Sequence, residues 1–290
     1  MMKKLNLIAA CIFLLLFVVT SPVSGKRISL DITSAEARKI VFAVPWFESS
    51  GSSSDTKLDR SLAETLSKAL VFHGIIDVLP NQRVIGSGSG DWARLGADYG
   101  VIGRYSVNKD QINMEIRLFD AADDKMLMGK AYKGPLDEQD QMIYKFTDAA
   151  INELTGKPGL ATTQIAFVTP PSDKREREVF LTDILGRKMR QVTRHRNLVV
   201  SPRFSPDGTY LAYTSYHSGN QSLYITDLRQ SKTTRVISRR KGMNLAPAWS
   251  PGGDTMVVTL SFKGNPDLFL INNRGEILQQ LTKQTGINVS

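Results

Sequence analysis

The residue types that most often carry catalysis or bind metals are sparse in this chain and do not group together. The three histidines, His73, His195 and His217, have no Cys or carboxylate partners at ligand spacing. Residues 86–90 read Gly-Ser-Gly-Ser-Gly, but glycine occupies the position of a nucleophile, and Asp91 stands where a dinucleotide loop needs its last glycine. No Walker-type Gly-Lys-Ser/Thr run is present. We therefore predict a flexible loop at 86–90 and no catalytic residue, metal site or cofactor.

The most informative pattern is a repeat in the C-terminal half. Residues 201–208 read Ser-Pro-Arg-Phe-Ser-Pro-Asp-Gly, and residues 246–253, at a spacing of 45, read Ala-Pro-Ala-Trp-Ser-Pro-Gly-Gly. A degenerate third copy lies about 44 residues upstream of the first. In the turn at 205–208, proline presets φ, and Asp-Gly supplies side-chain hydrogen bonding and a permissive backbone. Short β-rich repeats of this length predict a stacked β architecture such as a propeller, because one unit cannot bury its own apolar face.

The chain before the repeat has a different character and predicts an α/β or α+β domain over residues 39–157. Its alternating and helical apolar patterns predict strands and helices in mixed order. The expected strands are 39–45, 75–79, 99–107, 111–120 and 125–132, and the expected helices are 57–73, 91–95 and 137–155. From residue 164 to residue 290 no helical period remains, and this span is assigned to propeller blades.

The N-terminus has the features of a secretory signal peptide over residues 1–25. Two lysines precede an apolar run over 5–19, and small residues follow it. Cys11 raises the alternative of a lipoprotein cleavage site, although eight apolar residues follow this cysteine. The mature chain would contain no cysteine and no membrane span. Residues 26–38 begin with an alternating, strand-like pattern, which fits either strand addition to a partner or docking onto the chain's own domain.

Charge is distributed unevenly along the chain, whose net charge is +9. Residues 26–157 hold 17 Lys and Arg against 19 Asp and Glu, whereas residues 158–290 hold 18 against nine. Such a basic region suits nucleic acid, an acidic membrane surface or an acidic protein. An exported protein does not ordinarily meet nucleic acid, so we expect no nucleic-acid partner. A basic surface that serves only solubility remains the alternative.

Both halves resemble one known family. The repeat resembles the propeller module of the TolB family, which other propeller proteins share in part. Residues 40–47 (IVFAVPWF), 97–104 (ADYGVIGR) and 150–156 (AINELTG) resemble the N-terminal domain of that family in order and spacing. The resemblance implies an α/β N-terminal domain followed by a six-bladed propeller, of which residues 164–290 make just under three modules. We expect either an incomplete chain or a short form that closes by pairing three blades with three in a dimer.

The resemblance further implies a periplasmic binding protein rather than an enzyme. It would link the inner-membrane protein TolA to the outer-membrane lipoprotein Pal, for envelope integrity and outer-membrane invagination in cell division. The residues that would belong to the TolA-binding segment are Arg27, Ile28, Leu30 and Ile32. The residues on loops that would face Pal are Asn197, Ser201, Met243, Asn244 and Ala246. At the position of Met243 relatives often have histidine.

Two other functions fit parts of the sequence. Propellers also precede the catalytic domain of prolyl-oligopeptidase-like hydrolases, but this chain shows no Ser/Asp/His domain. The basic repeat surface also suits a module that binds polyanions or glycans. Salt-sensitive binding to anionic lipid or peptidoglycan without Pal would favour the latter.

Overall fold

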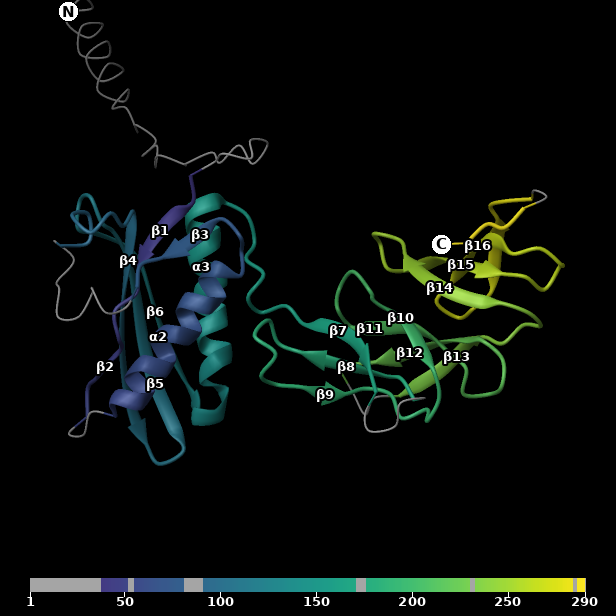
Figure 1. Ribbon diagram of the computed structural model, residues 1–290, viewed down its shortest axis with the longest axis horizontal. Helices are drawn as coiled ribbons and strands as arrows, with labels where there is room; N and C mark the ends of the chain where they lie inside the picture. The colour runs from purple at the N-terminus through teal and green to yellow at the C-terminus, as the bar shows by residue number, and fades with distance from the viewer. Residues whose placement is uncertain are drawn as a thin grey trace, which may run out of the picture.

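The chain forms two lobes joined by residues 156–164 (Figure 1). This computed structural model describes residues 38–51, 55–80, 91–170, 176–229, 233–283 and 286–289. The predicted signal peptide, the segment before Arg38 and the loop at 86–90 lie outside the described residues. No helix in the described ranges is long and apolar enough to cross a membrane.

The N-terminal lobe is a mixed six-stranded sheet with two helices packed against it (Figure 1). Its strand order is β3-β1-β4-β5-β6, and β2 pairs with β4. Pairing is parallel between β1 and its two neighbours and antiparallel from β4 to β6. The elements are β1 (Ile40–Ala43), β2 (Glu48–Ser49), α2 (Thr56–Val71), β3 (Ile76–Val78), β4 (Tyr99–Asn108), β5 (Gln111–Asp120), β6 (Lys125–Pro135), η3 (Leu136–Glu138) and α3 (Gln139–Thr155).

Helix α2 forms where the helical spacing of leucines predicts it. Asp55 caps its N-terminus by accepting hydrogen bonds from the backbone N–H groups of residues 57 and 58. Leu62, Leu66 and Leu70 are almost fully buried and pack toward the sheet. Burial of each such side chain contributes about 1.5–3 kcal/mol. Helix α3 ends at Gly156, whose φ of +71° suits the predicted C-terminal cap.

Asp91 is in a 3-10 turn and residues 92–96 form further turns, in place of the regular short helix expected at 91–95; the Leu95 N–H donates to the carbonyls of residues 91 and 92. Trp92 is completely buried there and meets Phe119 edge-on, with 6.2 Å between ring centroids. Gly100 leaves room for the indole, because a Cβ at this position would lie 1.8 Å from the Trp92 ring. The packing of Trp92 against the sheet therefore accompanies the turn conformation of residues 91–96.

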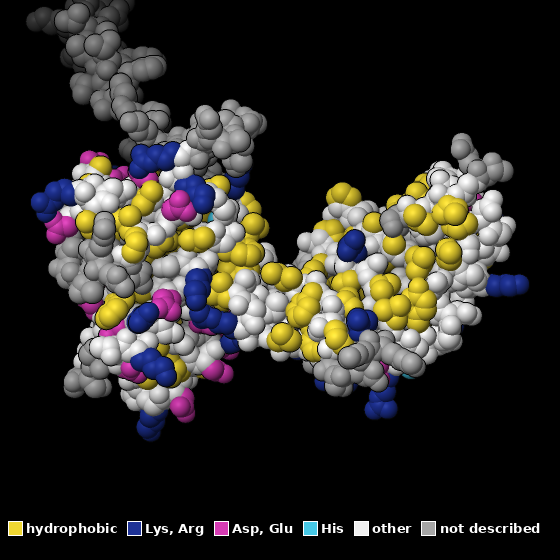
Figure 2. Space-filling view, in the orientation of Figure 1, with side chains coloured by type: hydrophobic (Ala, Val, Ile, Leu, Met, Phe, Trp, Pro, Cys, Tyr) yellow, Lys and Arg dark blue, Asp and Glu magenta, His cyan; other side chains and the backbone are white. Residues whose placement is uncertain are grey.

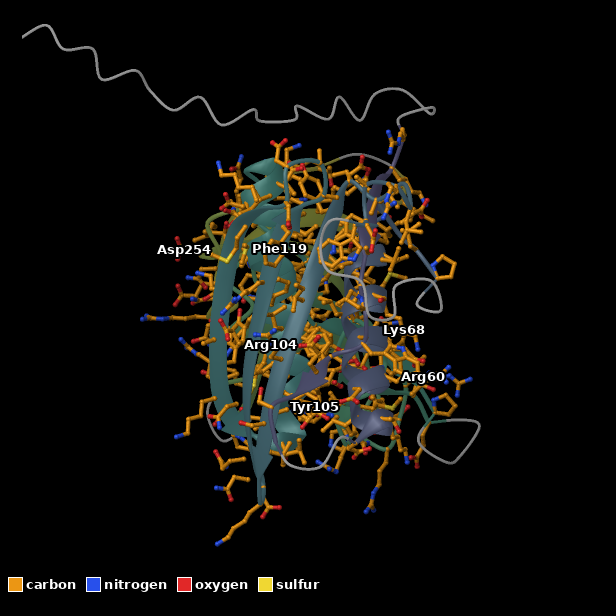
Figure 3. The ribbon with its side chains drawn as sticks, turned by 90° about the vertical axis from the view of Figure 1, so that its left-hand side faces the viewer. Arg60, Lys68, Arg104, Tyr105, Phe119 and Asp254 are labelled. Atoms are coloured by element: carbon orange, nitrogen blue, oxygen red, sulfur yellow. The ribbon has the colours of Figure 1, made fainter. Side chains whose placement is uncertain are left out.

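A buried polar pair joins α2 to the sheet. The Tyr105 hydroxyl on β4 donates a 2.7 Å hydrogen bond to the Asp59 carboxylate on α2. Burial, together with Asp59, raises the pKa of Tyr105, so the phenol stays protonated as the donor. Figure 3 shows this tyrosine between strand and helix, whereas Arg60 and Lys68 lie along α2.

The C-terminal lobe consists of three consecutive β-sheets, which we call blades 1, 2 and 3. Within each blade the strands follow chain order and pair antiparallel. Strand β7 of blade 1 corresponds to β11 and β15, so the described part of blade 1 holds no counterpart of β10. The strands are β7 (Ile165–Thr169), β8 (Glu178–Thr182) and β9 (Arg190–Gln191); β10 (Val199–Phe204), β11 (Tyr210–Ser215), β12 (Ser222–Asp227) and β13 (Thr234–Ser238); β14 (Asn244–Trp249), β15 (Thr255–Leu260), β16 (Asp267–Asn272) and β17 (Ile277–Gln280).

Adjacent blades bury their apolar faces against each other. Blades 1 and 2 share one cluster that includes Leu181 and Tyr213, and blades 2 and 3 share another that includes Ile225 and Phe269. The predicted turn at 205–208 is present, closed by Asp207, which accepts a bond from the N–H of residue 209. These sheets confirm the predicted fold class, an α/β domain followed by about three propeller blades that do not close.

The two lobes contact each other through the loop between β8 and β9. Tyr144 of α3 is fully buried and donates a 3.2 Å hydrogen bond to Asp183 of this loop. Arg187 reaches back to the Thr65 hydroxyl at 2.7 Å and to the Asp140 carboxylate at 3.1 Å. Both helices of the first lobe therefore hold blade 1.

Candidate partner-binding surface

Two of the predicted partner-facing residues, Asn197 and Met243, lie in loops at one end of the blades, which we call the loop mouth; Ser201, Asn244 and Ala246 lie in the strands that begin there, β10 and β14. The loop mouth comprises the loops that precede the innermost strands and those that follow the second strands. Antiparallel order places both kinds at the same end. Its described residues are 176–177, 193–198, 216–221, 239–243, 261–266, 281–283 and 286–288. In each module the two kinds of loop are joined: Asn197 Nδ2 donates to the Tyr216 carbonyl at 3.2 Å, and Met243 N donates to Ser261 Oγ at 2.7 Å.

Two of the predicted residues present side chains to solvent. Asn197 is exposed, and its Oδ1 accepts a 2.7 Å bond from the N–H of residue 198. The Met243 side chain is 37% exposed. Both are placed where a partner could touch them.

Asn244 has a different position, because its side chain is completely buried. Its Nδ2 donates to the carbonyls of Gln221, Arg240 and Gly242 at 3.1, 2.7 and 3.1 Å. Its Oδ1 accepts a bond from Ser238 Oγ. Asn244 therefore holds the loop in place from inside the blade. Its side chain does not face a partner as expected, because it is buried.

Ser201 and Ala246 occupy equivalent bulges in the innermost strands of blades 2 and 3. Their φ values are +53° and +51°, a left-handed conformation that a non-glycine residue seldom adopts. Each precedes a proline, which lacks the N–H that a ladder needs, and the pairing register shifts at both places. The repeat thus uses Ser-Pro and Ala-Pro to bend the start of each innermost strand.

A threonine of the preceding blade holds the second bulge. Thr214 of β11 is fully buried, and its hydroxyl accepts a 3.3 Å hydrogen bond from Ala246 N. Thr214→Val removes this bond with little change of shape and is expected to lower the free energy of unfolding by about 1 kcal/mol. Urea denaturation of the whole chain measures this. A Thr214→Val variant as stable as the native chain would contradict the role assigned to this hydroxyl.

The structure brings two histidines together that the sequence left apart. His195 and His217 meet edge-to-face, with 5.2 Å between ring centroids. His195 Nδ1 lies 3.0 Å from Ser215 Oγ, and its Nε2 lies 3.2 Å from the Tyr213 hydroxyl. Burial lowers the pKa of His195, and His217 lowers it too, against an opposing effect of Glu178. Both ring nitrogens of His195 have hydroxyl partners, and no group of three or more potential metal ligands occurs among the described residues.

Buried carboxylates anchor the loops that lead into the innermost strands. Glu178, 1% exposed, begins β8 and accepts bonds from the Thr193 hydroxyl and, at 2.7 Å, from the N–H of Arg196. Asp267, 7% exposed, begins β16 and accepts a 2.8 Å bond from the Thr282 hydroxyl. No local sequence signal identifies these anchors, because each joins a strand start to a loop 15 residues later.

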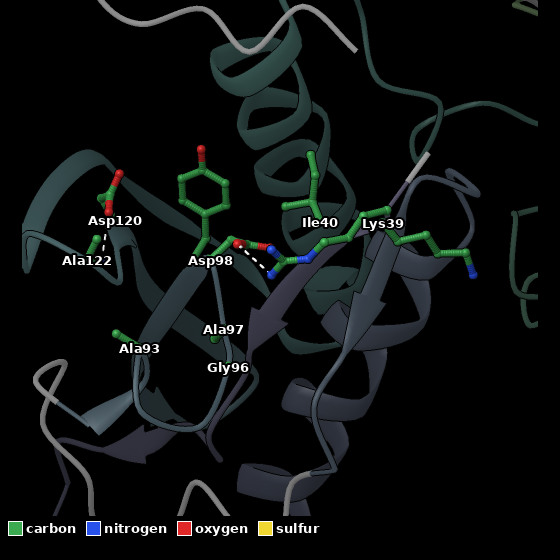
Figure 4. Close-up of a pocket in the computed structure, with 10 residues that line it drawn as sticks. Lys39, Ile40, Ala93, Gly96, Ala97, Asp98, Asp120 and Ala122 are labelled. Atoms are coloured by element: carbon green, nitrogen blue, oxygen red, sulfur yellow. Dashed lines mark hydrogen bonds and ion pairs between the residues drawn. The ribbon is translucent and has the colours of Figure 1, made fainter. Parts of the chain in front are cut away.

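The N-terminal lobe has a pocket of about 490 Å³ beside the first described residues (Figure 4). Arg38, the last residue of the predicted 26–38 segment, lies in it and pairs with Asp98 at 3.0 Å. Asp98 also accepts a 2.9 Å bond from the N–H of Val41. Its carboxylate is therefore committed to holding the start of β1. Arg27, Ile28, Leu30 and Ile32 lie outside the described residues.

Comparison with known proteins agrees with this arrangement. The family model of the TolB amino-terminal domain matches residues 28–127, and that of the TolB β-propeller domain matches residues 151–290. The Tol-Pal system protein TolB of Desulfotalea psychrophila is 53% identical over 213 residues, which cover 73% of this chain and 48% of that protein. The protein of the same name from Syntrophus aciditrophicus is 33% identical over 72% of this chain and 49% of its own length.

A solved structure supports the fold. The crystal structure of TolB from Acinetobacter baumannii superposes with a TM-score of 0.73 at 24% identity, over 86% of this chain and 62% of that one. The chain spans about half the length of the curated relatives it matches. These relatives are named as components of a Tol-Pal system, and neither name states an enzymatic activity. Both halves match TolB domains in the order of that family, and the chain therefore belongs to the TolB family.

Proposed function

We propose that this chain is part of a periplasmic protein-binding scaffold of the Tol–Pal envelope system. The scaffold would link inner-membrane TolA to outer-membrane Pal and support envelope integrity and the invagination of the outer membrane in cell division. The proposal is supported by one combined observation: the chain matches both TolB domains, and its loop mouth presents side chains to solvent. Export to the periplasm rests on the predicted signal peptide at 1–25.

The loop mouth is the proposed Pal-binding surface. Asn197 and Met243 would contact Pal directly, because both side chains are exposed. Ser201 and Ala246 would set the backbone bulges, and Asn244 would hold the loop between β13 and β14. Residues 26–38, with Arg27, Ile28, Leu30 and Ile32, are the proposed TolA-binding segment.

A pull-down with the secreted chain tests the proposal. The chain should capture both Pal and TolA from the cells that make it. Capture of neither partner by this chain and by a form extended to six blades would end the scaffold proposal. Salt-sensitive retention on peptidoglycan in the absence of Pal would favour the polyanion- or glycan-binding alternative.

A separate test asks whether TolA and Pal bind to different parts of the chain, the 26–38 segment and the loop mouth. Deletion of residues 26–33 should abolish capture of TolA and leave capture of Pal unchanged, because the loop mouth lies on the other lobe. Quantitative pull-down of the deleted and intact chains, side by side, measures both partners. Equal loss of Pal would contradict the separation proposed here.

A further inference from the structure

We propose that the loop mouth is a cationic docking surface for a protein partner that presents a cluster of carboxylates. This inference rests on the proposed function, since it names the chemistry of the partner at the same mouth. It begins from the excess of positive charge in residues 158–290, which the structure assigns to one end of the blades.

Cations crowd the described loops of the mouth, and accessible carboxylates are scarce there. Six of these cations are exposed: Arg194, Arg196, Arg239, Lys241, Lys263 and Lys283. Glu176 is the one carboxylate in the described mouth loops. None of the ion pairs found among the described residues involves any of the six cations. Lys263 lies over the rings of Phe262 and Phe269 and donates to Gln280, but no described carboxylate neutralises any of the six.

Three of the cations repeat with the blades. Arg194, Arg239 and Lys283 hold equivalent positions at spacings of 45 and 44, and each directly follows a hydroxyl residue. In the first and third loops that hydroxyl donates to the buried carboxylate at the start of a strand, Glu178 or Asp267. In the second loop the hydroxyl of Ser238 donates instead to the buried Asn244 Oδ1. A buried acceptor thus holds each of the three loops, and the repeat places one cation per loop around the mouth.

The spacing of the blades allows these charges to act together. Packed sheets lie about 10 Å apart, which is close to the Debye length of about 8 Å at physiological ionic strength. The potentials of neighbouring loops therefore overlap in front of the mouth. Apart from Glu176, the carboxylates closest to these loops in the chain are Glu178 and Asp267, which are 1% and 7% exposed and are engaged by the loops. An approaching partner therefore meets mainly cations.

Among the described residues, the opposite end of the blades shows no such excess. Its turns carry Asp183, Asp207, Asp227 and Asp254 alongside Arg187, Lys188 and Arg229. Arg229 pairs with Asp227 there at 3.5 Å. In the view of Figure 2, the acidic side chains lie mainly on the N-terminal lobe, and the coloured side chains of the propeller lobe are mainly apolar, with a few Lys and Arg among them.

The apolar groups among the cations favour a protein over a lipid surface. Met243 is 37% exposed and Ile287 is 80% exposed, at corresponding places in two successive loops. Exposed methionine beside arginine is typical of protein interfaces, where both residue types are enriched. The mouth would thus pair its cations with carboxylates and its Met243 and Ile287 with an apolar part of the same partner surface.

Charge reversal at the three repeated positions tests the proposal. The variant Arg194→Glu, Arg239→Glu, Lys283→Glu is compared in the full chain with Lys125→Glu, Lys130→Glu, Lys133→Glu, which alters the net charge equally at exposed cations of the N-terminal lobe. Binding to poly-L-glutamate, to the periplasmic domain of Pal and to phosphatidylglycerol vesicles is measured at low and high salt. The mouth variant should weaken binding to poly-L-glutamate and to Pal at least about tenfold at low salt, and the matched variant should not.

Three results would overturn the inference. They are equal weakening by both triple variants, no weakening by either, and binding of the native chain to the vesicles but not to poly-L-glutamate. If Pal binds the native and mouth variants equally well, this inference fails while the proposed function stands. If the native chain does not bind Pal but binds poly-L-glutamate through the mouth, the proposed function fails and the inference stands.

Discussion

Gly275→Ala is expected to destabilise the propeller lobe by about 3–5 kcal/mol, because two blades meet at this residue. Gly275 lies in the turn between β16 and β17 of blade 3 and has a φ of +86°. A Cβ there would lie 1.7 Å from the carbonyl oxygen of Ile237 in blade 2. The Gly275 carbonyl also accepts a 2.9 Å hydrogen bond from Arg240 Nη2. Backbone on both sides of the contact must therefore move, and the hydrogen bond would be strained with it.

Gly264→Ala is the matched control for this prediction. Gly264 also has a positive φ, +111°, but a Cβ at that position meets nothing within 4 Å. Alanine there should lower the free energy of unfolding by only about 1–2 kcal/mol, which is the cost of placing a residue with a Cβ at a positive φ. Urea unfolding of both variants, followed by tryptophan fluorescence, compares them. Equal losses would show that the contact between blades 2 and 3 is not as tight as described.

Asp148→Ala is expected to lower the free energy of unfolding by about 3–5 kcal/mol, because the Asp148 carboxylate holds the segment that joins the lobes. Asp148 of α3 accepts hydrogen bonds from Ala161 N at 2.6 Å and from Thr162 N and Oγ1 at 3.0 and 2.6 Å. His73 Nε2 lies 3.8 Å away. The Asp148 side chain is 18% exposed, so solvent replaces these partners poorly. Asp110→Ala, at an exposed turn in the same lobe, should change the stability by less than about 0.5 kcal/mol.

The same carboxylate gives the stability a pH dependence. Burial raises the pKa of Asp148, but the contacts with His73, Thr162 and Ala161 outweigh this effect and leave the pKa below its usual value. A group whose pKa falls on folding stabilises the native state above its unfolded pKa, which is about 3.9 for Asp. That contribution is lost as the pH falls through the folded pKa. The difference between the native chain and Asp148→Ala should therefore be largest near pH 7 and shrink below pH 3.9. A difference independent of pH would contradict the role of the charge.

Local sequence signals predicted much of the fold. Strand β5 occupies the predicted residues 111–120, and α2 begins one residue before its predicted start, because periodicity and capping are properties of neighbouring residues. The turn at 205–208 follows from its own proline, aspartate and glycine. The regular helix expected at 91–95 is replaced by turns around the buried Trp92.

The candidate surface was less predictable, because distant residues build it. The family resemblance pointed to Asn197 and Met243, whose side chains are exposed. It could not show that Asn244 is buried, that His195 meets His217, or that Glu178 anchors a loop 15 residues away. Each of these depends on which strands lie side by side. The charge excess was visible in the sequence, but only the topology shows that six of its exposed cations lie in loops at one end of the blades.

Site-specific photo-crosslinking in living cells tests the central claim that the loop mouth is the surface that binds Pal. A photoreactive phenylalanine analogue replaces Met243, which is 37% exposed at the mouth, or Met126, which is 52% exposed on the N-terminal lobe. The account predicts a crosslink to Pal from position 243 and none from position 126. A crosslink to Pal from position 126 alone, or of equal yield from both positions, would contradict it.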